Sequence, residues 1–150
     1  MATDRPTYRH RVRYHEADAQ GFLFNGRYLE LADVAMTEWL RQLGWPYPEL
    51  VAAGADPSVV SAQLQFKRPA RFDEVLDVDV SCTNVGRSSF SLRTEVRRGE
   101  DQIAVMELTY VNVDPATATS RPLPAPVVEA LRSGGRRLEP AVPAAEGGDR

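Results

Sequence analysis

The spacing of apolar residues divides the chain into one helical segment and several strand-like segments. Between Arg27 and Leu43 they recur at helical spacing, on a stripe too wide for a surface helix, and Gly44 and Pro46 follow as stop signals. The stripe consists of Leu29, Leu31, Ala32, Val34, Ala35, Met36, Trp39, Leu40 and Leu43. The pattern predicts one long helix over residues 27–43, largely surrounded by other structure.

Other segments follow a period of two, which predicts half-buried strands over residues 6–15, 60–67, 76–82 and 89–97. Ile103–Val113 is almost continuously apolar, which predicts a strand lying centrally in the sheet against the helix. Short turn sequences at 84–87 and 98–101 favour antiparallel hairpins. Residues 45–57 read as a loop with a helical turn around 48–53, and residues 122–131 as ending in a short helix.

This order of elements, with four consecutive strands joined by short turns, predicts an α+β fold in which an antiparallel sheet of about five strands wraps around one long helix. We expect residues 1–132 to form one domain and residues 133–150, rich in Gly, Pro, Ala, Glu and Arg, to be a disordered C-terminal tail. The exposed edge of such a sheet favours pairing with a second copy, so we expect a homodimer or homotetramer.

Composition narrows the class of protein. A length of 150 residues suffices for one core, and a net charge of −3 argues against a nucleic-acid-binding domain. The single cysteine, Cys82, excludes an internal disulfide and fits a reducing compartment. No apolar run approaches the ~18 residues of a membrane span, and the N-terminus has no apolar signal core. We therefore expect a soluble cytoplasmic protein.

The candidate catalytic residues lie in segment 14–28, where Asp18 precedes an apolar run and then the helix. Burial can tune such a carboxylate, and the N–H groups of the first helical turn can polarise a carbonyl group, which is a catalytic arrangement. The alternative is that Asp18 only caps a turn. His10 and His15 have no Cys or carboxylate partners at metal-ligand spacing, so we expect no metal site.

Two sequence blocks carry a resemblance to a known family. Arg13–Gly21 and Tyr28 follow a pattern of the type R-Y-x-E-T-D-A-x-G-x-V-x-H-x-x-Y, and residues 66–76 resemble Y-x-x-P-A-x-F-x-D-x-L. Gly86–Ser89 stands where the same family often has a G-x-S/T-S turn. The chain thus resembles the hotdog-fold acyl-CoA thioesterases typified by 4-hydroxybenzoyl-CoA thioesterase and its Tol–Pal-associated relatives, over about residues 7–131.

The resemblance implies hydrolysis of an acyl thioester with Asp18 as the catalytic acid, acting as nucleophile or as general base for water. It places the oxyanion donor, a backbone N–H at the start of the helix, at Asn25, and Gly26 then lets the turn approach the substrate. Three positions depart from the family pattern, one of them Arg27, where many relatives have Asn or Ser. Asn25 stands where many relatives have His, and Ala17 where Thr is usual.

For the thiol half of the substrate, the resemblance implies coenzyme A or an acyl carrier protein, both of which present phosphopantetheine, and no cofactor. The candidate substrate-binding residues are Tyr14, Gly21, Phe24, Tyr28, Arg68, Arg87, Ser88 and Ser89, with Arg71 in reserve. The arginines and serines are equally compatible with solvated turn positions. We expect Phe22, Phe24, Trp39 and the loop 45–57 to shape the acyl pocket.

Two other functions remain open. One is a non-catalytic module that binds an acyl group or an acyl carrier protein, although the presence of the family's acid argues against it. The other is a hotdog dehydratase or hydratase, for which we expect a paired motif such as D-x-x-x-x-H, and none follows Asp18. If Asp18 is not the acid, Glu30 and Asp33 on the helix are the next candidates.

Overall fold

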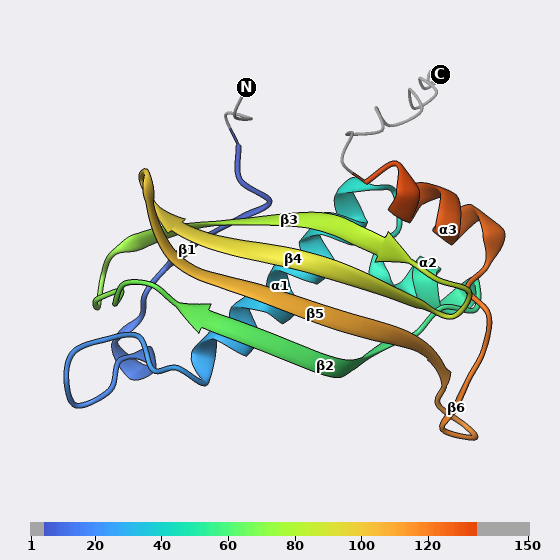
Figure 1. Ribbon diagram of the computed structural model, residues 1–150, viewed down its shortest axis with the longest axis horizontal. Helices are drawn as coiled ribbons and strands as arrows, with labels where there is room; N and C mark the ends of the chain where they lie inside the picture. Colours follow the sequence, from blue (N-terminus) through green and yellow to red (C-terminus); the bar gives the residue numbers. More distant parts are fainter. Residues whose placement is uncertain (1–4, 135–150) are drawn as a thin grey trace, which may run out of the picture.

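The computed structural model describes residues 5–134, and they form a curled antiparallel sheet wrapped around one long helix (Figure 1). The sheet contains β1 (Tyr8–Arg11), β2 (Pro57–Phe66), β3 (Val75–Val85), β4 (Ser89–Arg98), β5 (Asp101–Asp114) and the two-residue β6 (Thr119–Ser120). The helices are α1 (Arg27–Gln42), α2 (Tyr47–Ala52) and α3 (Ala125–Arg132), with a 3-10 turn, η1, over Tyr14–Glu16. The predicted architecture is confirmed. Of the predicted C-terminal tail, residues 135–150 lie outside the described part of the chain.

The core forms where α1 crosses the concave face of the sheet. Ala32 and Ala35 on α1 are fully buried and small, so the helix backbone approaches the sheet closely. The predicted alternation holds on β4, where Phe90, Leu92 and Val96 all face the core. The helix is less enclosed than its sequence suggests: the side chains of Leu29 and Val34 are 40% and 41% exposed.

The strand order is β1-β3-β4-β5-β2, with every neighbouring pair antiparallel. β3, β4 and β5 are joined by hairpins as predicted, but β2 and β3 are not neighbours. The segment 67–74 carries the chain from one edge of the sheet to the other side, so β2 pairs with β5 and becomes an edge strand. β5 is an interior strand, whereas the central one is β4.

The N-terminal strand is shorter than the predicted 6–15. It ends at Arg11, because Val12 then exchanges backbone hydrogen bonds with the 73–74 turn instead of a strand: its N–H donates to Glu74 O and its carbonyl accepts from Asp73 N, both at 2.9 Å. The chain then tightens into η1, where the Glu16 carboxylate accepts the N–H of Arg13 at 2.7 Å. This turn starts the loop that carries Asp18.

Candidate active site

Asp18 lies in a tight hairpin between η1 and α1. Its N–H donates to Phe22 O at 2.8 Å, and Ala17 pairs with Leu23 across the hairpin. Gly21 adopts φ +82°, in the left-handed region that favours glycine, and its N–H donates to Asp18 O at 2.9 Å. The local geometry therefore explains this glycine as part of the turn that presents Asp18.

The two carboxylate oxygens of Asp18 differ. Oδ1 accepts the N–H groups of Gln20 at 2.8 Å and Phe22 at 3.2 Å, which is the turn-capping function considered from sequence. Oδ2 has no hydrogen-bond partner within residues 5–134. One oxygen thus fixes the side chain while the other is available to a substrate or a water.

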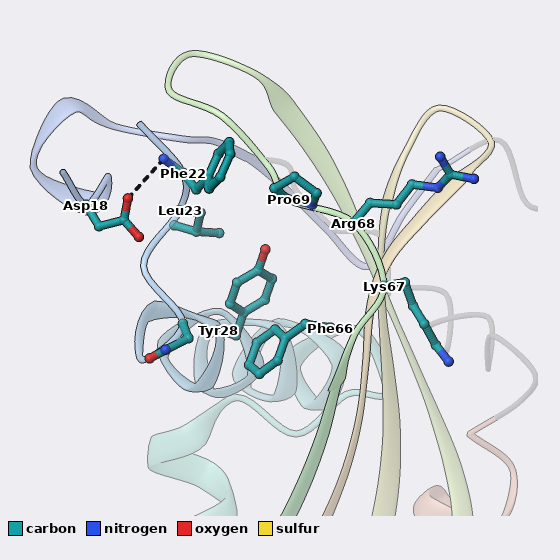
Figure 2. A pocket seen from close by; sticks show the side chains of 9 residues that line it. Asp18, Phe22, Leu23, Tyr28, Phe66, Lys67, Arg68 and Pro69 are labelled. Atoms are coloured by element: carbon teal, nitrogen blue, oxygen red, sulfur yellow. Dashed lines mark hydrogen bonds between the residues drawn. The ribbon is translucent and has the colours of Figure 1, made fainter. Parts of the chain in front are cut away.

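Asp18 borders a cavity of about 350 Å³, shown in Figure 2. The hairpin and the start of α1 form one side, and the segment that follows β2 forms the other. The lining residues are Asp18, Phe22, Leu23, Asn25, Tyr28, Phe66, Lys67, Arg68 and Pro69. The cavity therefore combines a carboxylate, one end of a helix and an apolar wall, and it can hold a small acyl group beside the carboxylate.

The start of α1 offers backbone donors to this cavity. The N–H groups of Arg27 and Tyr28 already donate to Phe24 O and Asn25 O, at 2.9 and 3.3 Å. Those of Asn25, which lines the cavity, and of Gly26, which follows it outside the lining, donate to no group in the described part of the chain. Two unpaired N–H groups at the positive end of a helix can stabilise a developing oxyanion.

Gly26 is the N-cap residue of α1. Its φ of −66° and ψ of −20° are ordinary right-handed values. An added Cβ would lie 3.1 Å from the Phe24 ring, so a larger residue here would require that ring to shift by a few tenths of an ångström. Phe24 covers this glycine and is half exposed, outside the cavity lining.

Tyr28 is the most buried polar side chain of the lining, at 3% exposure, and its hydroxyl points into the cavity (Figure 2). Its ring meets Phe66 edge-on, with 5.1 Å between ring centroids. Burial raises the pKa of Tyr28 to about 12, so the hydroxyl keeps its proton at neutral pH. No hydrogen-bond partner for this hydroxyl occurs among residues 5–134, so it remains a donor for a ligand.

The basic side chains beside the cavity are oriented away from Asp18. Figure 2 shows Lys67 and Arg68 directed to the opposite side of their strand, while Arg71 places its guanidinium 4.8 Å from the centroid of the Phe22 ring. Neither Lys67 nor Arg68 has an ion-pair partner in the described chain. These two cations are therefore available at the rim and not in the depth of the cavity.

Several predicted site residues lie elsewhere in the single chain. Tyr14 is 84% exposed, against the edge of Phe72, and does not line the cavity. Of the residues expected to shape the pocket, only Phe22 does so, because Trp39 belongs to the core under α1 and the 45–57 loop lies outside the lining. Sequence reasoning missed four lining residues, Leu23, Phe66, Lys67 and Pro69; Phe66 and Pro69 belong to the second block of the family resemblance, which did not mark them as part of a pocket.

The predicted Arg87, Ser88 and Ser89 stand at the start of β4, at the other end of the sheet. The cavity adjoins Ile103 on β5, whereas Ser89 pairs with Val111, eight residues or about 27 Å along the same strand. There a second cavity of about 160 Å³ is lined by Arg87, Ser88, Ser120, Arg121 and Pro122. Sequence reasoning missed the second arginine of this basic cavity, which β6 brings beside the first.

Two further candidates were the acids of α1. Glu30 accepts hydrogen bonds from Arg27 on the helix surface, at 3.0 and 3.2 Å. Burial raises the pKa of Asp33, which lies farther along the same helix and does not line the Asp18 cavity. Across residues 5–134 no group of three or more His, Cys, Asp or Glu side chains is placed to hold a metal ion, and no helix is long and apolar enough to cross a membrane.

Comparison with known proteins identifies a family that this chain matches. Residues 20–105, more than half of the chain, match the model of the thioesterase superfamily. The acyl-CoA thioester hydrolase YbgC of Escherichia coli is 27% identical over 119 residues, which cover 79% of this chain and 89% of YbgC.

Solved structures agree. A gentisyl-coenzyme A thioesterase is 27% identical, with a TM-score of 0.75 over 83% of this chain and 98% of that one. A 1,4-dihydroxy-2-naphthoyl-CoA thioesterase from Synechocystis shares the fold with a TM-score of 0.74 at 21% identity, over 83% of this chain and 93% of that one. The hotdog fold expected from the sequence is confirmed.

Proposed function

The chain belongs to the thioesterase superfamily, and we propose that Asp18 is the carboxylate with which it hydrolyses its acyl thioester substrate. The observation that carries this proposal is the free Oδ2 of Asp18 at a cavity that also receives the start of α1. Hydrolysis converts the thioester and one water into a carboxylic acid and a thiol.

Two routes use the same atoms. In one, Oδ2 attacks the thioester carbon, the thiolate leaves, and water then hydrolyses the mixed anhydride. In the other, Oδ2 removes a proton from a water that attacks the same carbon. Both routes place negative charge on the carbonyl oxygen. The unpaired N–H groups of Asn25 and Gly26 support its stabilisation in either case.

The thiol carrier in this proposal is coenzyme A or an acyl carrier protein, and the basic cavity at Arg87 is its phosphate site, supplied by a second subunit. β2 supports this, since it is an edge strand exposed on both faces of the single chain, with Val60 59% exposed. Two copies paired antiparallel through β2 place Pro57 of one beside Phe66 of the other.

This pairing joins the two cavities. Within one chain Pro57 pairs with Asn112, whose N–H donates to Ser88 O at 2.7 Å. The partner's Arg87 and Arg121 would therefore approach the Asp18 cavity, where Lys67 and Arg68 add positive charge at the rim. The homodimer, the carrier and the cytoplasmic location stay predictions.

The test is release of thiol from a panel of aliphatic and aromatic acyl-CoA and acyl-carrier-protein esters, by wild type and Asp18→Asn. We expect turnover by wild type that falls by a factor on the order of 10² or more in the variant, because the amide neither attacks nor accepts a proton. Turnover unchanged in the variant would refute Asp18 and move the search to Glu30 and Asp33. Tight acyl binding without turnover on both kinds of ester would instead indicate a binding module.

A further inference from the structure

A buried acid–base pair stands at the base of the hairpin that carries Asp18. Among the carboxylates of residues 5–134, Glu16 alone is buried, at 8% exposure, and His10 on β1 is 4% exposed. The Nε2 of His10 lies 2.8 Å from Oε1 of Glu16. A buried charge costs free energy unless it is well paired, so its position beside the proposed catalytic loop needs an explanation.

Glu16 connects β1 to both arms of the hairpin. Its Oε1 bonds to His10 and also accepts the N–H of Arg13, while its main-chain carbonyl accepts the N–H of Phe24 at 2.9 Å. Asp18 lies only two residues further on. A displacement of Glu16 therefore moves the start and the end of the hairpin together, and Asp18 with them.

The neighbouring groups determine which ring nitrogen of His10 carries the proton. Nδ1 of His10 lies 3.4 Å from a guanidinium nitrogen of Arg13 and 3.0 Å from the Tyr8 hydroxyl. A guanidinium can only donate, so Nδ1 accepts, and the imidazole donates from Nε2 to Glu16. His10 therefore links the Arg13 guanidinium to the Glu16 carboxylate through its two ring nitrogens.

The charge on Glu16 is maintained by its contacts. Burial alone would raise the pKa of Glu16, but the hydrogen bonds that its carboxylate accepts from the Arg13 N–H and from His10 favour the charged form, and the pKa is lowered. The carboxylate is therefore ionised at neutral pH and accepts both hydrogen bonds. These contacts hold Glu16 in a defined position at the base of the hairpin.

We propose that Glu16, held by His10, is a positioning residue that orients the free Oδ2 of Asp18 toward the thioester carbon. The inference rests on the proposed function of Asp18. Misplacement of a reacting group by about 1 Å costs about 10²-fold in rate, so the rigidity of this link acts on turnover through geometry.

Glu16→Ala removes the acceptor, and we expect kcat to fall by about 10- to 100-fold with little change in KM. Glu16→Gln keeps an acceptor oxygen of the same reach and should recover most of the loss. His10→Gln is a second variant in case Glu16→Ala folds poorly; it leaves the Arg13 bond in place and should give an intermediate kcat. Each variant is compared with wild type on the best ester of the panel.

Two controls separate positioning from general destabilisation. Leu131→Ala creates a cavity under α3, at the opposite end of the molecule from the hairpin (Figure 1), and should lower Tm without lowering kcat. In an Asp18→Asn background Glu16→Ala should add no further loss, because the group it orients is already inactive.

Three results would overturn the inference: wild-type kcat in Glu16→Ala, an equal loss in Leu131→Ala at matched Tm, or a full additional loss in the Asp18→Asn background. Failure of the proposed function is recognised separately, by an Asp18→Asn enzyme that keeps wild-type turnover.

Discussion

Removing the hydroxyl of Tyr110 should stabilise the protein. Tyr110 on β5 is 1% exposed and stacks on Phe90 with 5.1 Å between ring centroids and 15° between planes. Its hydroxyl is buried without a hydrogen-bond partner in residues 5–134. Burial, with a smaller contribution from the charge of Asp33, raises the pKa of Tyr110, so the hydroxyl keeps its proton.

Tyr110→Phe keeps the ring stack and removes only the unpaired hydroxyl. A buried polar group without a partner costs about 1–3 kcal/mol, so we expect the variant to gain about 1 kcal/mol of unfolding free energy, or about 2–4 °C in Tm for a chain of this size. Thermal and urea denaturation measure this change. Thiol release should be unchanged, because Tyr110 does not line the Asp18 cavity.

Tyr28→Phe is the matched comparison, since its hydroxyl opens into the cavity. A lost hydrogen bond of about 0.5–1.5 kcal/mol to the substrate predicts a roughly 2- to 10-fold lower kcat/KM with Tm little changed. A Tyr110→Phe variant that loses 1 kcal/mol or more would refute the reasoning. It would mean that the Tyr110 hydroxyl has a partner, such as a second subunit or a bound water.

Three further predictions concern assembly, substrate and pH. Val60→Lys on the exposed β2 edge should shift the oligomer toward monomer in sedimentation velocity; an unchanged sedimentation coefficient would refute pairing through β2. Arg87→Ala should raise KM for acyl-CoA but not for the corresponding acyl-pantetheine, which lacks phosphate; equal effects on both would contradict a phosphate site. Glu16 is buried and Glu74 is partly buried, which raises the pKa of each carboxyl, yet hydrogen bonds from Arg13 and His10 to Glu16, and from Arg71 and Arg98 to Glu74, lower it below the ordinary 4.5. They therefore stabilise the fold above about pH 4.5, and this contribution is lost as the pH falls through the lowered values. Glu16→Gln should therefore reduce the loss of unfolding free energy below about pH 4.5, which urea denaturation at a series of pH values measures.

The sequence determined the elements whose signal is local. The helix predicted over residues 27–43 forms as Arg27–Gln42, because its apolar spacing and its stop signals lie within the segment itself. The alternation on β4 likewise fixed which side chains face the core. The position of Asp18 before the helix also followed from adjacent residues, and the family resemblance followed from two short blocks.

Only the tertiary structure decided which segments meet. Alternation sets the faces of a strand but not its neighbours, so the crossing of residues 67–74 that moves β2 beside β5 had no local signal. That crossing brings Phe66 and Pro69 to the cavity of Asp18 and leaves the Arg87 cavity at the far end of the sheet. The pairing of His10 with Glu16 joins residues only six apart, but it forms because β1 ends at Arg11 and the chain turns through η1, whereas the alternation of the sequence predicts a strand that continues to residue 15. The sequence shows which side chains can act as an acid or a hydrogen-bond donor. Whether they share a cavity depends on contacts between segments far apart in the chain.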